Sequence, residues 1–524
     1  MRPTLPQDQD FASLRNGFRW DVPPRLNMAA QACHDWAARE PDRVALIDLS
    51  EAARRDVTYG TLQGMTHALA AHLAAAGVAR GDRVGVLRTQ SAWTAAAHLA
   101  VWHLGAISIP LFRLFGRDAL ETRLSDSGAA HVITDAESVD LLHEFPVTPH
   151  IPEDLALDLD TRHPMADTGP EDAAVLMYTS GTTGAPKGAL HGHRMLTGHL
   201  PGVEISHDLL GQPGDCLWTP ADWAWIGGLF DVLMPGLAVG VPVVAARMAK
   251  FDSQECLNII REATVRNVFF PPTALKRLRA DGVRIPGLRS VASGGEPLGA
   301  EMLAWGQDAF RLTINEFYGQ TECNMVASSC AALFPPHPGA IGRAVPGFDL
   351  AVLDAHGQPT NGEGDIAIRR GAASMFLEYW KNPDAKTEKF CGDWMRTGDR
   401  GQWDGDYLRF IGRDDDVITS AGYRIGPAEV EDCLMRHPAV AVAAVVGMPD
   451  PERTEAVTAC IIPAPGHTAD PALAEALRAH VGAILSRHLA PRAVHFMEAL
   501  PMTVTGKIQR KTLRETLMEQ GDTP

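Results

Sequence analysis

Residues 173–188 read AAVLMYTSGTTGAPKG, an apolar run followed by a loop of glycines and hydroxyl-bearing residues. The apolar run predicts a buried strand over residues 173–177. In the loop, glycines let backbone N–H groups approach phosphate oxygens closely, hydroxyl groups add polar contacts, and the lysine adds a positive charge. The predicted phosphate-binding residues are Thr179, Ser180, Gly181, Thr182, Thr183, Gly184 and Lys187.

This loop differs from the common P-loop of nucleotide hydrolases. Lys187 follows Pro186 instead of a glycine and precedes Gly188 instead of a serine or threonine. By itself the stretch fits a mobile surface loop as well as a phosphate-binding loop, so at this point both interpretations stay open.

On both sides of the loop, from about residue 28 to 300, helical stretches alternate with short β-branched runs. This alternation predicts parallel sheets covered by helices. Two long apolar stretches, 93–112 and 226–246, are interrupted by glycine and proline, so each is interpreted as a buried helix followed by a strand and not as a membrane span. Strands are predicted at residues 83–87, 131–134, 243–245 and 267–270.

The pattern changes after about residue 340. Short strands at 350–353, 365–368 and 407–411 are separated by Asn-Gly and Asp-Gly turn signals, which predicts a β-rich subdomain over about 340–411. Beyond residue 416 a small unit begins. Its clearest helix is predicted over 471–489, with Leu473, Leu477, Val481, Ile484 and Leu485 on one buried face.

Composition excludes several classes of protein. The 524 residues include 47 Lys and Arg against 64 Asp and Glu, a net charge of −17, which disfavours binding to nucleic acid or to an anionic membrane surface. The eight cysteines form no CxxC pair, and the first residues have no apolar signal segment. We therefore expect reduced thiols and a cytoplasmic location.

Six further motifs follow the Thr/Ser/Gly loop in order. Together the seven motifs resemble those of the adenylate-forming superfamily, in particular its short- and medium-chain acyl-CoA synthetases, and they extend over nearly the whole chain. The motifs are SGGEPL (293–298), YGQTE (318–322), WMRTGD (394–399), GRDDD (412–416), AGYRIGP (421–427) and PMTVTGKI (501–508).

The resemblance implies a role for each motif. Gly295, Glu296 and Pro297 would form the adenine wall, and Tyr318 would stack on the base. Thr321 would contact phosphate, while Glu322 would be the carboxylate partner of Mg²⁺, a cation that prefers oxygen ligands. The other residues expected at the nucleotide are Glu316, Gly319, Gln320, the ribose clamp Asp399, and Arg413.

Lys507 is the main catalytic candidate that the resemblance implies. Its ammonium group would stabilise charge as the carboxylate of an organic acid attacks the α-phosphate of ATP and pyrophosphate leaves. In a second step the thiol of coenzyme A would displace AMP from the acyl-adenylate. Lys507 also fits a solvated lysine in a basic helix start, since Arg510, Lys511 and Arg514 follow it.

The resemblance also implies a moving part and sets the domain boundaries. Residues 1–411 would be the N-terminal adenylation domain, 412–416 the hinge, centred on Asp415, and 417–524 a mobile α+β C-terminal lid domain. In one orientation Lys507 would close the site. In the other, Gly422, Tyr423 and Arg424 would replace it and form the thiol tunnel.

Two glycines suggest the size of the acid. Acetyl-CoA synthetases carry a tryptophan at the place of Gly319 and a threonine at the place of Gly227, so both glycines are expected to open space for a short-to-medium-chain or branched acid. Gly319→Trp is then expected to shift preference toward acetate. The predicted pocket consists of Trp223, Trp225, Ile226, Gly227, Gly228 and Gly319.

Three alternatives stay open. The acid substrate is either aliphatic or aryl. The thiol that accepts the acyl group belongs either to coenzyme A or to a separate acyl-carrier protein. A non-catalytic nucleotide-binding scaffold is a third possibility. Oligomeric state and pathway are left open, and His191 and His193 are interpreted as ordinary histidines because no Cys/His cluster completes a metal site.

Overall fold

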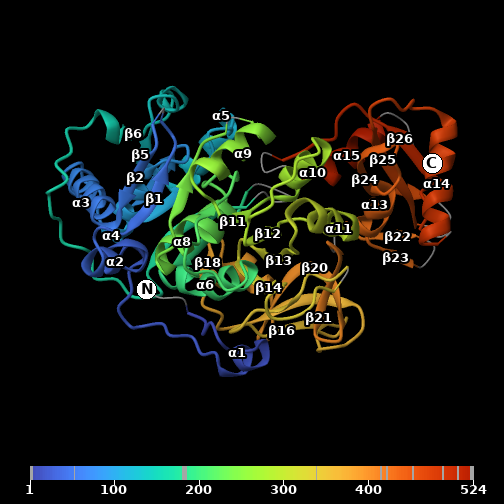
Figure 1. Ribbon diagram of the computed structural model, residues 1–524, viewed down its shortest axis with the longest axis horizontal. Helices are drawn as coiled ribbons and strands as arrows, with labels where there is room; N and C mark the ends of the chain where they lie inside the picture. The colour runs from blue at the N-terminus through green and yellow to red at the C-terminus, as the bar shows by residue number, and fades with distance from the viewer. Residues whose placement is uncertain are drawn as a thin grey trace.

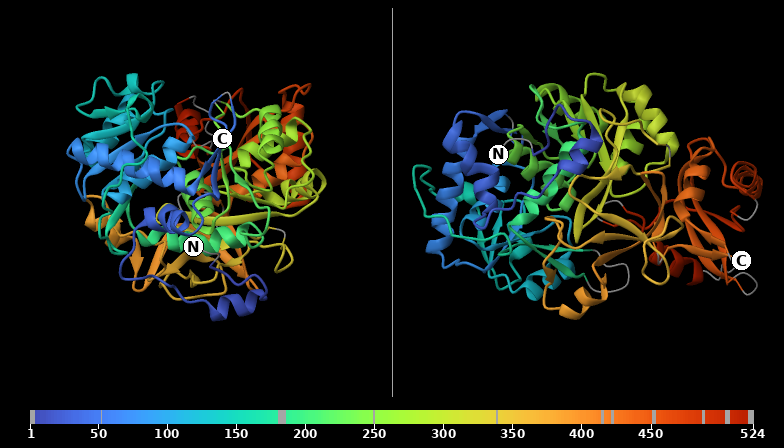
Figure 2. Two further views of the ribbon diagram at one scale, coloured as in Figure 1. Left: turned by 60° about the vertical axis from the view of Figure 1, so that its left-hand side comes forward. Right: turned by 90° about the horizontal axis from the view of Figure 1, so that it is seen from below.

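The structure is a computed structural model. It describes residues 4–519 apart from 52, 180–185, 249, 338, 414–415, 421–422, 451–453, 487–488 and 504–506. Two large sheets and their helices make up the first part of the chain, a smaller sheet follows, and a separate C-terminal unit lies at the other end of the molecule (Figures 1 and 2). This is the predicted α/β architecture with a large N-terminal domain and a small C-terminal one.

The first large sheet has nine strands, and its central strands are parallel. Its two ends are closed by antiparallel strands, β2 on one side and β14 with β15 on the other. In spatial order the strands are β15 (Arg343–Ala344), β14 (Cys323–Ser328), β13 (Ile314–Gln320), β12 (Ser290–Gly294), β11 (Asn267–Phe269), β9 (Leu217–Trp218), β10 (Val243–Ala245), β1 (Val44–Asp48) and β2 (Arg55–Thr58).

The second large sheet has seven strands and a parallel centre. Its order is β18 (Glu378–Tyr379), β8 (Gly188–Gly192), β7 (Ala173–Tyr178), β4 (Ile107–Pro110), β3 (Arg83–Leu87), β5 (His131–Thr134) and β6 (Thr148–His150). The prediction of parallel sheets from the alternating pattern is thus confirmed for the central strands.

Helices fill the space between the two sheets. The largest apolar cluster combines side chains of both sheets with those of α4 (Ala92–His103), α6 (Arg194–Ser206) and α8 (Met234–Val239). A helix buried on all sides is apolar on all sides, which explains the two long apolar stretches in the sequence. Each stretch is a helix followed by a short strand, as predicted, and in the described part of the chain no helix is both long and apolar enough to cross a bilayer.

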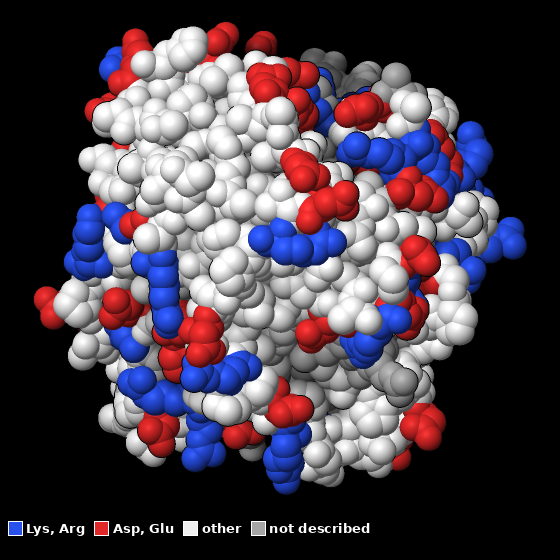
Figure 3. All heavy atoms as spheres, turned by 90° about the vertical axis from the view of Figure 1, so that its left-hand side faces the viewer, with Lys and Arg blue, Asp and Glu red and all other residues white. Residues whose placement is uncertain are grey.

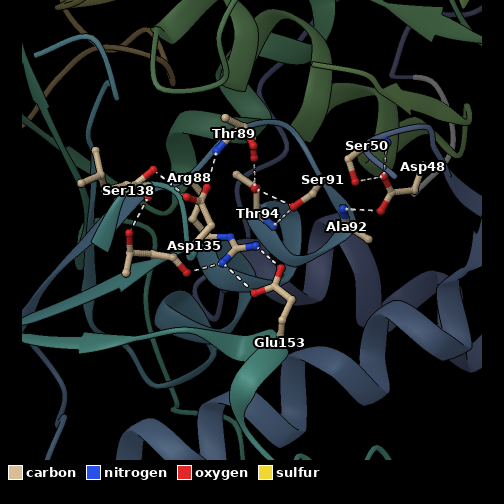
Figure 4. A network of polar contacts seen from close by, with 12 residues as sticks. Asp48, Ser50, Arg88, Thr89, Ser91, Ala92, Thr94, Asp135, Ser138 and Glu153 are labelled. Carbon is tan, nitrogen blue, oxygen red and sulfur yellow. Dashed lines mark hydrogen bonds and ion pairs between the residues drawn. The ribbon is translucent and has the colours of Figure 1, made fainter. Parts of the chain in front are cut away.

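A polar network fixes the two sheets relative to each other (Figure 4). Asp48, at the end of β1 in the first sheet, accepts hydrogen bonds from the backbone N of Ala92 at 2.9 Å and from the hydroxyl of Ser50 at 2.6 Å. Ala92 begins α4, which follows β3 of the second sheet. Beside it Arg88 pairs with Glu153. Hydrogen bonds to a charged group are stronger than neutral ones, so the hydrogen bond from Ala92 to the Asp48 carboxylate holds the start of α4 in place.

The third sheet is the β-rich subdomain. Its strands are β16 (Leu350–Leu353), β17 (Gly364–Arg369), β20 (Trp394–Asp404) and β19 (Phe390–Cys391), and β21 (Tyr407–Arg413) pairs with β20. Residues 340–411 are not self-contained, because β15 joins the first large sheet and β18 joins the second. This subdomain therefore bridges both large sheets.

The C-terminal unit is a sheet with helices on both faces. Its strands are β23 (Tyr423–Ile425), β22 (Ile418–Ser420), β25 (Thr454–Pro463), β24 (Val440–Asp450) and β26 (Ala493–Phe496), with helices α13 (Pro427–Met435), α14 (Pro471–Ile484) and α15 (Arg510–Glu519). Alternate residues of β24 face opposite ways, so Val445 packs under α13 and α14 while Val446 packs under α15.

The predicted helix over 471–489 is wrong at its end. The chain leaves helical geometry at Leu485, and Ile484, predicted to be buried, is 46% exposed. The turn brings Leu485 and Leu489 back against the apolar cluster. A straight helix would have carried these two side chains past the sheet.

Candidate active site

Several predicted site residues lie where strands end. The parallel strands β12 and β13 finish at one edge of the first sheet, which places the 295–298 loop beside the turn at Thr321 and Glu322. In the second sheet β7 runs into the 179–187 loop. Ligands of open α/β sheets bind at these carboxyl ends.

The 179–187 loop connects two antiparallel strands, because β7 pairs with β8 through Tyr178 and Gly188. Its ends are held together by a hydrogen bond of 2.9 Å from the backbone N of Thr179 to the carbonyl of Lys187. The Lys187 ammonium lies 5.5 Å from the centre of the Tyr379 ring. The other predicted phosphate contacts, Ser180, Gly181, Thr182, Thr183 and Gly184, lie outside the described residues.

Glu322 is buried, and its carboxylate has two close neighbours. The Tyr379 hydroxyl donates to Glu322 Oε1 at 2.5 Å, and the Lys389 ammonium lies 3.8 Å from the same oxygen. A buried carboxylate next to Thr321 and close to the phosphate loop has the oxygen chemistry that Mg²⁺ requires. Sequence reasoning missed Tyr379 and Lys389, since nothing around them in the sequence marks them.

Tyr318 and Asp399 form a direct pair. The Tyr318 hydroxyl donates to Asp399 Oδ2 at 2.5 Å. Burial raises the pKa of Asp399, and the hydrogen bond from Tyr318 and the charge of Arg413 oppose that rise. Arg413 lies opposite Asp399 in the register of β20 and β21. The structure thus brings together three residues that the motifs placed far apart in the chain.

The 295–298 loop is supported from behind by Glu316. The backbone N of Leu298 donates to Glu316 Oε1 at 3.2 Å, and burial raises the pKa of Glu316 to about 7. The loop leaves β12 at Gly295, whose φ of 97° suits glycine. Glu316 therefore supports this loop through a buried hydrogen bond. Glu296 in the loop lies 3.9 Å from the Lys276 ammonium.

Lys507 reaches this loop from the C-terminal unit. A Cβ placed on Gly295 would lie 3.8 Å from Lys507 Cε and 3.5 Å from the Trp225 indole. Desolvation lowers the pKa of Lys507, whereas the charges of Glu296 and Asp399 act to raise it. The lysine thus lies beside Gly295 of the predicted adenine wall, and it remains exposed to solvent there.

The segment predicted to form the thiol tunnel begins the sheet of the C-terminal unit. β23 carries Tyr423 and Arg424 and forms one edge of its sheet, whereas β24, on which α15 packs, forms the other. Gly422 and the predicted hinge residue Asp415 lie outside the described residues.

The predicted acid pocket needs a correction. A Cβ on Gly227 would lie 2.5 Å from the Trp225 ring, and a Cβ on Gly319 would lie 2.4 Å from both Asn324 Oδ1 and the backbone N of Met325. Both glycines therefore accommodate neighbouring groups of the protein and do not open free space. A tryptophan at 319 would displace the β13–β14 hairpin, so the expected shift of Gly319→Trp toward acetate is no longer supported.

The pocket tryptophans also differ from each other. Trp223 is 1% exposed and belongs to the apolar core, while Trp225 is half-buried and lies beside Gly295 and Phe269. Ile226 is buried, and Gly228 packs against the carbonyl of Asp222. Of the two tryptophans, Trp225 is the one that lies close to the site.

A buried polar pair lies beside Gly319. The side-chain amide of Asn324 donates to Asp231 Oδ1 at 2.7 Å, and both residues are buried. Burial raises the pKa of Asp231 well above its ordinary value. Sequence reasoning missed this pair, because Asp231 stands alone in an otherwise uncharged stretch.

Known proteins match this chain over most of its length. The family model of AMP-binding enzymes matches residues 33–380, and that of the AMP-binding enzyme C-terminal domain matches residues 429–507. The acetyl-coenzyme A synthetase of Bacillus subtilis is 32% identical over 468 residues, which are 83% of this chain and 81% of that protein. The mitochondrial acyl-coenzyme A synthetase ACSM4 of Rattus norvegicus is 31% identical over 97% of this chain and 93% of its own length.

Solved structures of CoA ligases also match this chain over nearly its whole length. An acyl-CoA synthetase of Brucella canis is 34% identical, with a TM-score of 0.72 and 98% coverage of both chains. The anthranilate CoA ligase AuaEII in complex with anthranoyl-AMP is 26% identical, with a TM-score of 0.85 over 96% of this chain and 99% of that one. The chain therefore belongs to the adenylate-forming AMP-binding enzyme family, among its acyl-coenzyme A synthetases.

Proposed function

We propose that this enzyme activates a short-to-medium-chain or branched carboxylic acid with ATP, releases pyrophosphate, and transfers the acyl group from acyl-AMP to coenzyme A. The observation that carries the proposal is the meeting of Lys507 with the Gly295 loop, beside the Tyr318–Asp399 pair. A lysine from the C-terminal unit at that place suits the adenylation step, because charge develops there as the acid attacks phosphorus.

The chain's own groups act by positioning and by charge. Asp399 accepts hydrogen bonds from the ribose hydroxyls, Thr321 and Lys187 contact phosphate oxygens, and the ammonium of Lys507 stabilises the charge of the transition state. Glu322 and Thr321 would hold Mg²⁺, which when bound neutralises phosphate charge. The mechanism needs no covalent nucleophile.

The second candidate is an aryl acid substrate. The buried Asn324–Asp231 pair beside Gly319 offers polar groups near the predicted pocket, and a ring substituent with a hydrogen-bonding group would match them better than an alkyl chain. The similarity to the anthranilate CoA ligase supports the same direction.

The test is a panel of carboxylic acids with AMP and thioester both quantified. Aliphatic acids of two to ten carbons and substituted benzoic acids are offered with ATP and Mg²⁺, first with coenzyme A and then with carrier proteins. AMP and acyl-CoA in equal amounts support the proposal. Acylated carrier without acyl-CoA supports the carrier-loading alternative, and ATP left intact with every acid supports the non-catalytic scaffold.

Asp399→Asn is expected to raise the KM for ATP by about 10- to 100-fold, because a hydrogen bond to a charged group contributes about 1.5–3 kcal/mol. The measurement is the initial rate of pyrophosphate release against ATP concentration. Asp404→Asn is the matched control, since Asp404 lies on the same strand and pairs with Arg409 at the surface. An unchanged KM for ATP in Asp399→Asn would remove Asp399 from the nucleotide site.

Asp415→Pro is expected to spare one half-reaction and abolish the other, because proline fixes φ at the proposed hinge. Pyrophosphate release measures the first half-reaction, and thioester formation from purified acyl-AMP measures the second. Asp415→Ala, which keeps φ free, should retain both. Equal loss of both in the proline variant would argue against a hinge at this residue.

A cytoplasmic location is part of the proposal. All eight cysteines are free thiols in the structure and seven of them are buried, which suits a reducing compartment. Fractionation of the cell should recover the protein with the cytoplasmic fraction, and recovery outside the cell or with the membrane fraction would contradict this location.

A further inference from the structure

Four histidines from separate segments meet away from the active site. His34 ends the short π-helix η1 (Ala30–His34), His67 lies in α3 (Tyr59–Ala75), His103 is the last residue of α4, and His163 lies in the segment that follows β6. One ring nitrogen of each of His34, His67 and His103 lies within 4.8 Å of the others. His34 Nε2 and His103 Nδ1 are 3.0 Å apart.

We propose that His34, His67 and His103 bind a divalent transition-metal ion, preferentially Zn²⁺. Imidazole is a preferred ligand of Zn²⁺ at about 2.0–2.1 Å, and three histidines with one open position are a known coordination set. With that bond length and tetrahedral angles, the three ring centres should lie about 5 Å apart. The observed separations are 5.1 Å for His34 and His67, 5.2 Å for His34 and His103, and 4.7 Å for His67 and His103.

The other ring nitrogens are held as in a metal site. The carbonyl of His163 lies 3.0 Å from His103 Nε2 and 3.1 Å from His67 Nδ1, while the backbone N of His163 lies 3.2 Å from His67 Nδ1. With His103 Nε2 donating to the carbonyl, His103 Nδ1 keeps its lone pair for the ion. His67 Nδ1 accepts from the backbone N–H of His163, so an ion bound at His67 Nε2 would displace the proton from that nitrogen. A backbone carbonyl that orients ligating histidines in this way is a usual outer partner of bound zinc.

Gln63 completes the arrangement around His34. Its amide nitrogen lies 3.3 Å from His34 Nδ1. Rotation of the Gln63 amide would place Gln63 Oε1 against a proton on His34 Nδ1. His34 Nε2 would then carry no proton and be free to bind the ion.

The fourth position is left open by the three histidines, since among the described residues His163 is not part of the group whose ligand atoms lie within 4.8 Å of one another. His163 Nδ1 is buried without a hydrogen-bond partner, and its ring centre lies 5.7 Å from that of His103. The ion is reachable from solvent because His34 and His67 are only half-buried. Figure 3 shows acidic and basic side chains interspersed on the face of the molecule that it draws.

The position assigns the ion a structural role. α4 starts after the carboxyl end of β3 and runs back, so His103 lies at the amino end of β4, while ligands bind at the carboxyl ends. An ion there would tie η1, α3, α4 and the segment carrying His163 together. Because it would bind the folded state and not a preformed site in the unfolded chain, it would stabilise the N-terminal domain.

The test is metal titration of the full-length protein after chelator treatment. We expect one Zn²⁺ per chain by calorimetry, a rise in melting temperature on binding, and with Co²⁺ the visible absorption of a four-coordinate ion. His34→Gln and His67→Asn should each weaken Zn²⁺ binding by about 100-fold or more, since loss of an outer partner alone costs 10- to 100-fold. His72→Gln, on the same helix but in contact with His150, is the matched control and should bind normally.

Two results would overturn the proposal. One is wild-type protein that takes up no Zn²⁺ or gives no four-coordinate Co²⁺ spectrum, a result that does not depend on any variant folding. The other is Zn²⁺ binding of the same affinity and stoichiometry in His34→Gln, His67→Asn and wild type, which would place the ion elsewhere.

Discussion

Replacement of Lys507 by alanine is expected to lower the rate of acyl-AMP formation by about 10²- to 10³-fold, the usual cost of losing one preorganised donor at a developing charge. The ammonium lies beside Gly295, and the charges of Glu296 and Asp399 are close enough to raise its pKa. These two carboxylates favour the charged form of the lysine, against the desolvation that disfavours it. The side chain is therefore placed to act as a cation.

The effect should be confined to the first half-reaction. Thioester formation from purified acyl-AMP and coenzyme A should remain within about twofold of wild type, because the lysine acts on the leaving of pyrophosphate. Rapid-quench measurement of pyrophosphate separates the two steps. Lys511→Ala is the matched control, since Lys511 lies four residues along in the same segment with its side chain 63% exposed. Equal losses in both half-reactions would contradict this role.

Acidification from pH 7 to 5.5 is expected to remove several kcal/mol from the free energy of unfolding. Six buried histidines outside the metal-site cluster have pKa values lowered by burial, His98, His191 and His207 to about 3 and His150, His193 and His199 to about 4. In the unfolded chain each histidine titrates near its ordinary value of about 6.5.

The lowered pKa values of these histidines make the folded state less stable at acid pH. Below pH 6.5 these histidines are protonated in the unfolded chain but stay neutral in the folded chain. Their contribution to the free energy of unfolding is therefore complete above pH 6.5 and decreases as the pH drops toward 4 and then 3. Each such histidine costs about 1 kcal/mol between pH 7 and 5.5, and six together cost several kcal/mol out of the about 5–15 kcal/mol of a typical domain. Acid unfolding well above the carboxylate pKa range is the expected result.

The measurement is the urea midpoint as a function of pH. His207→Asn should reduce the pH dependence by about one proton, because the amide can keep the contact that His207 Nδ1 makes with the Ser290 hydroxyl at 3.0 Å. His143→Gln is the control, since that ring is 68% exposed and should leave the profile unchanged. A urea midpoint that stays constant between pH 7 and 5.5 would show that these rings become protonated without unfolding.

Local sequence was enough for most strands. The strands at 83–87, 131–134, 243–245 and 350–353 occur at the predicted residues, because short β-branched apolar runs between turns have few other ways to be buried. The apolar helices between the sheets were predicted for the same reason. The predicted end of α14 was wrong, since the place where that helix stops depends on what Leu485 and Leu489 pack against.

Space around a glycine was not predictable. Gly227 and Gly319 stand where relatives carry larger side chains, yet the volume that they leave is occupied by Trp225 and by Asn324 with Met325. A missing side chain becomes a cavity only if neighbouring groups do not move into it, and neighbours are a property of the packed molecule.

The order of motifs along the chain determined the family and its chemistry, and it predicted Lys507, Asp399 and Glu322 as site residues, because phosphate, ribose and metal each demand particular residue types. Only the tertiary structure decided which groups touch. The Tyr318–Asp399 pair, the contact of Tyr379 with Glu322 and the histidine cluster each join residues far apart in sequence. Such contacts depend on how strands and helices pack, and packing is settled by the burial of the whole core and not by any one segment.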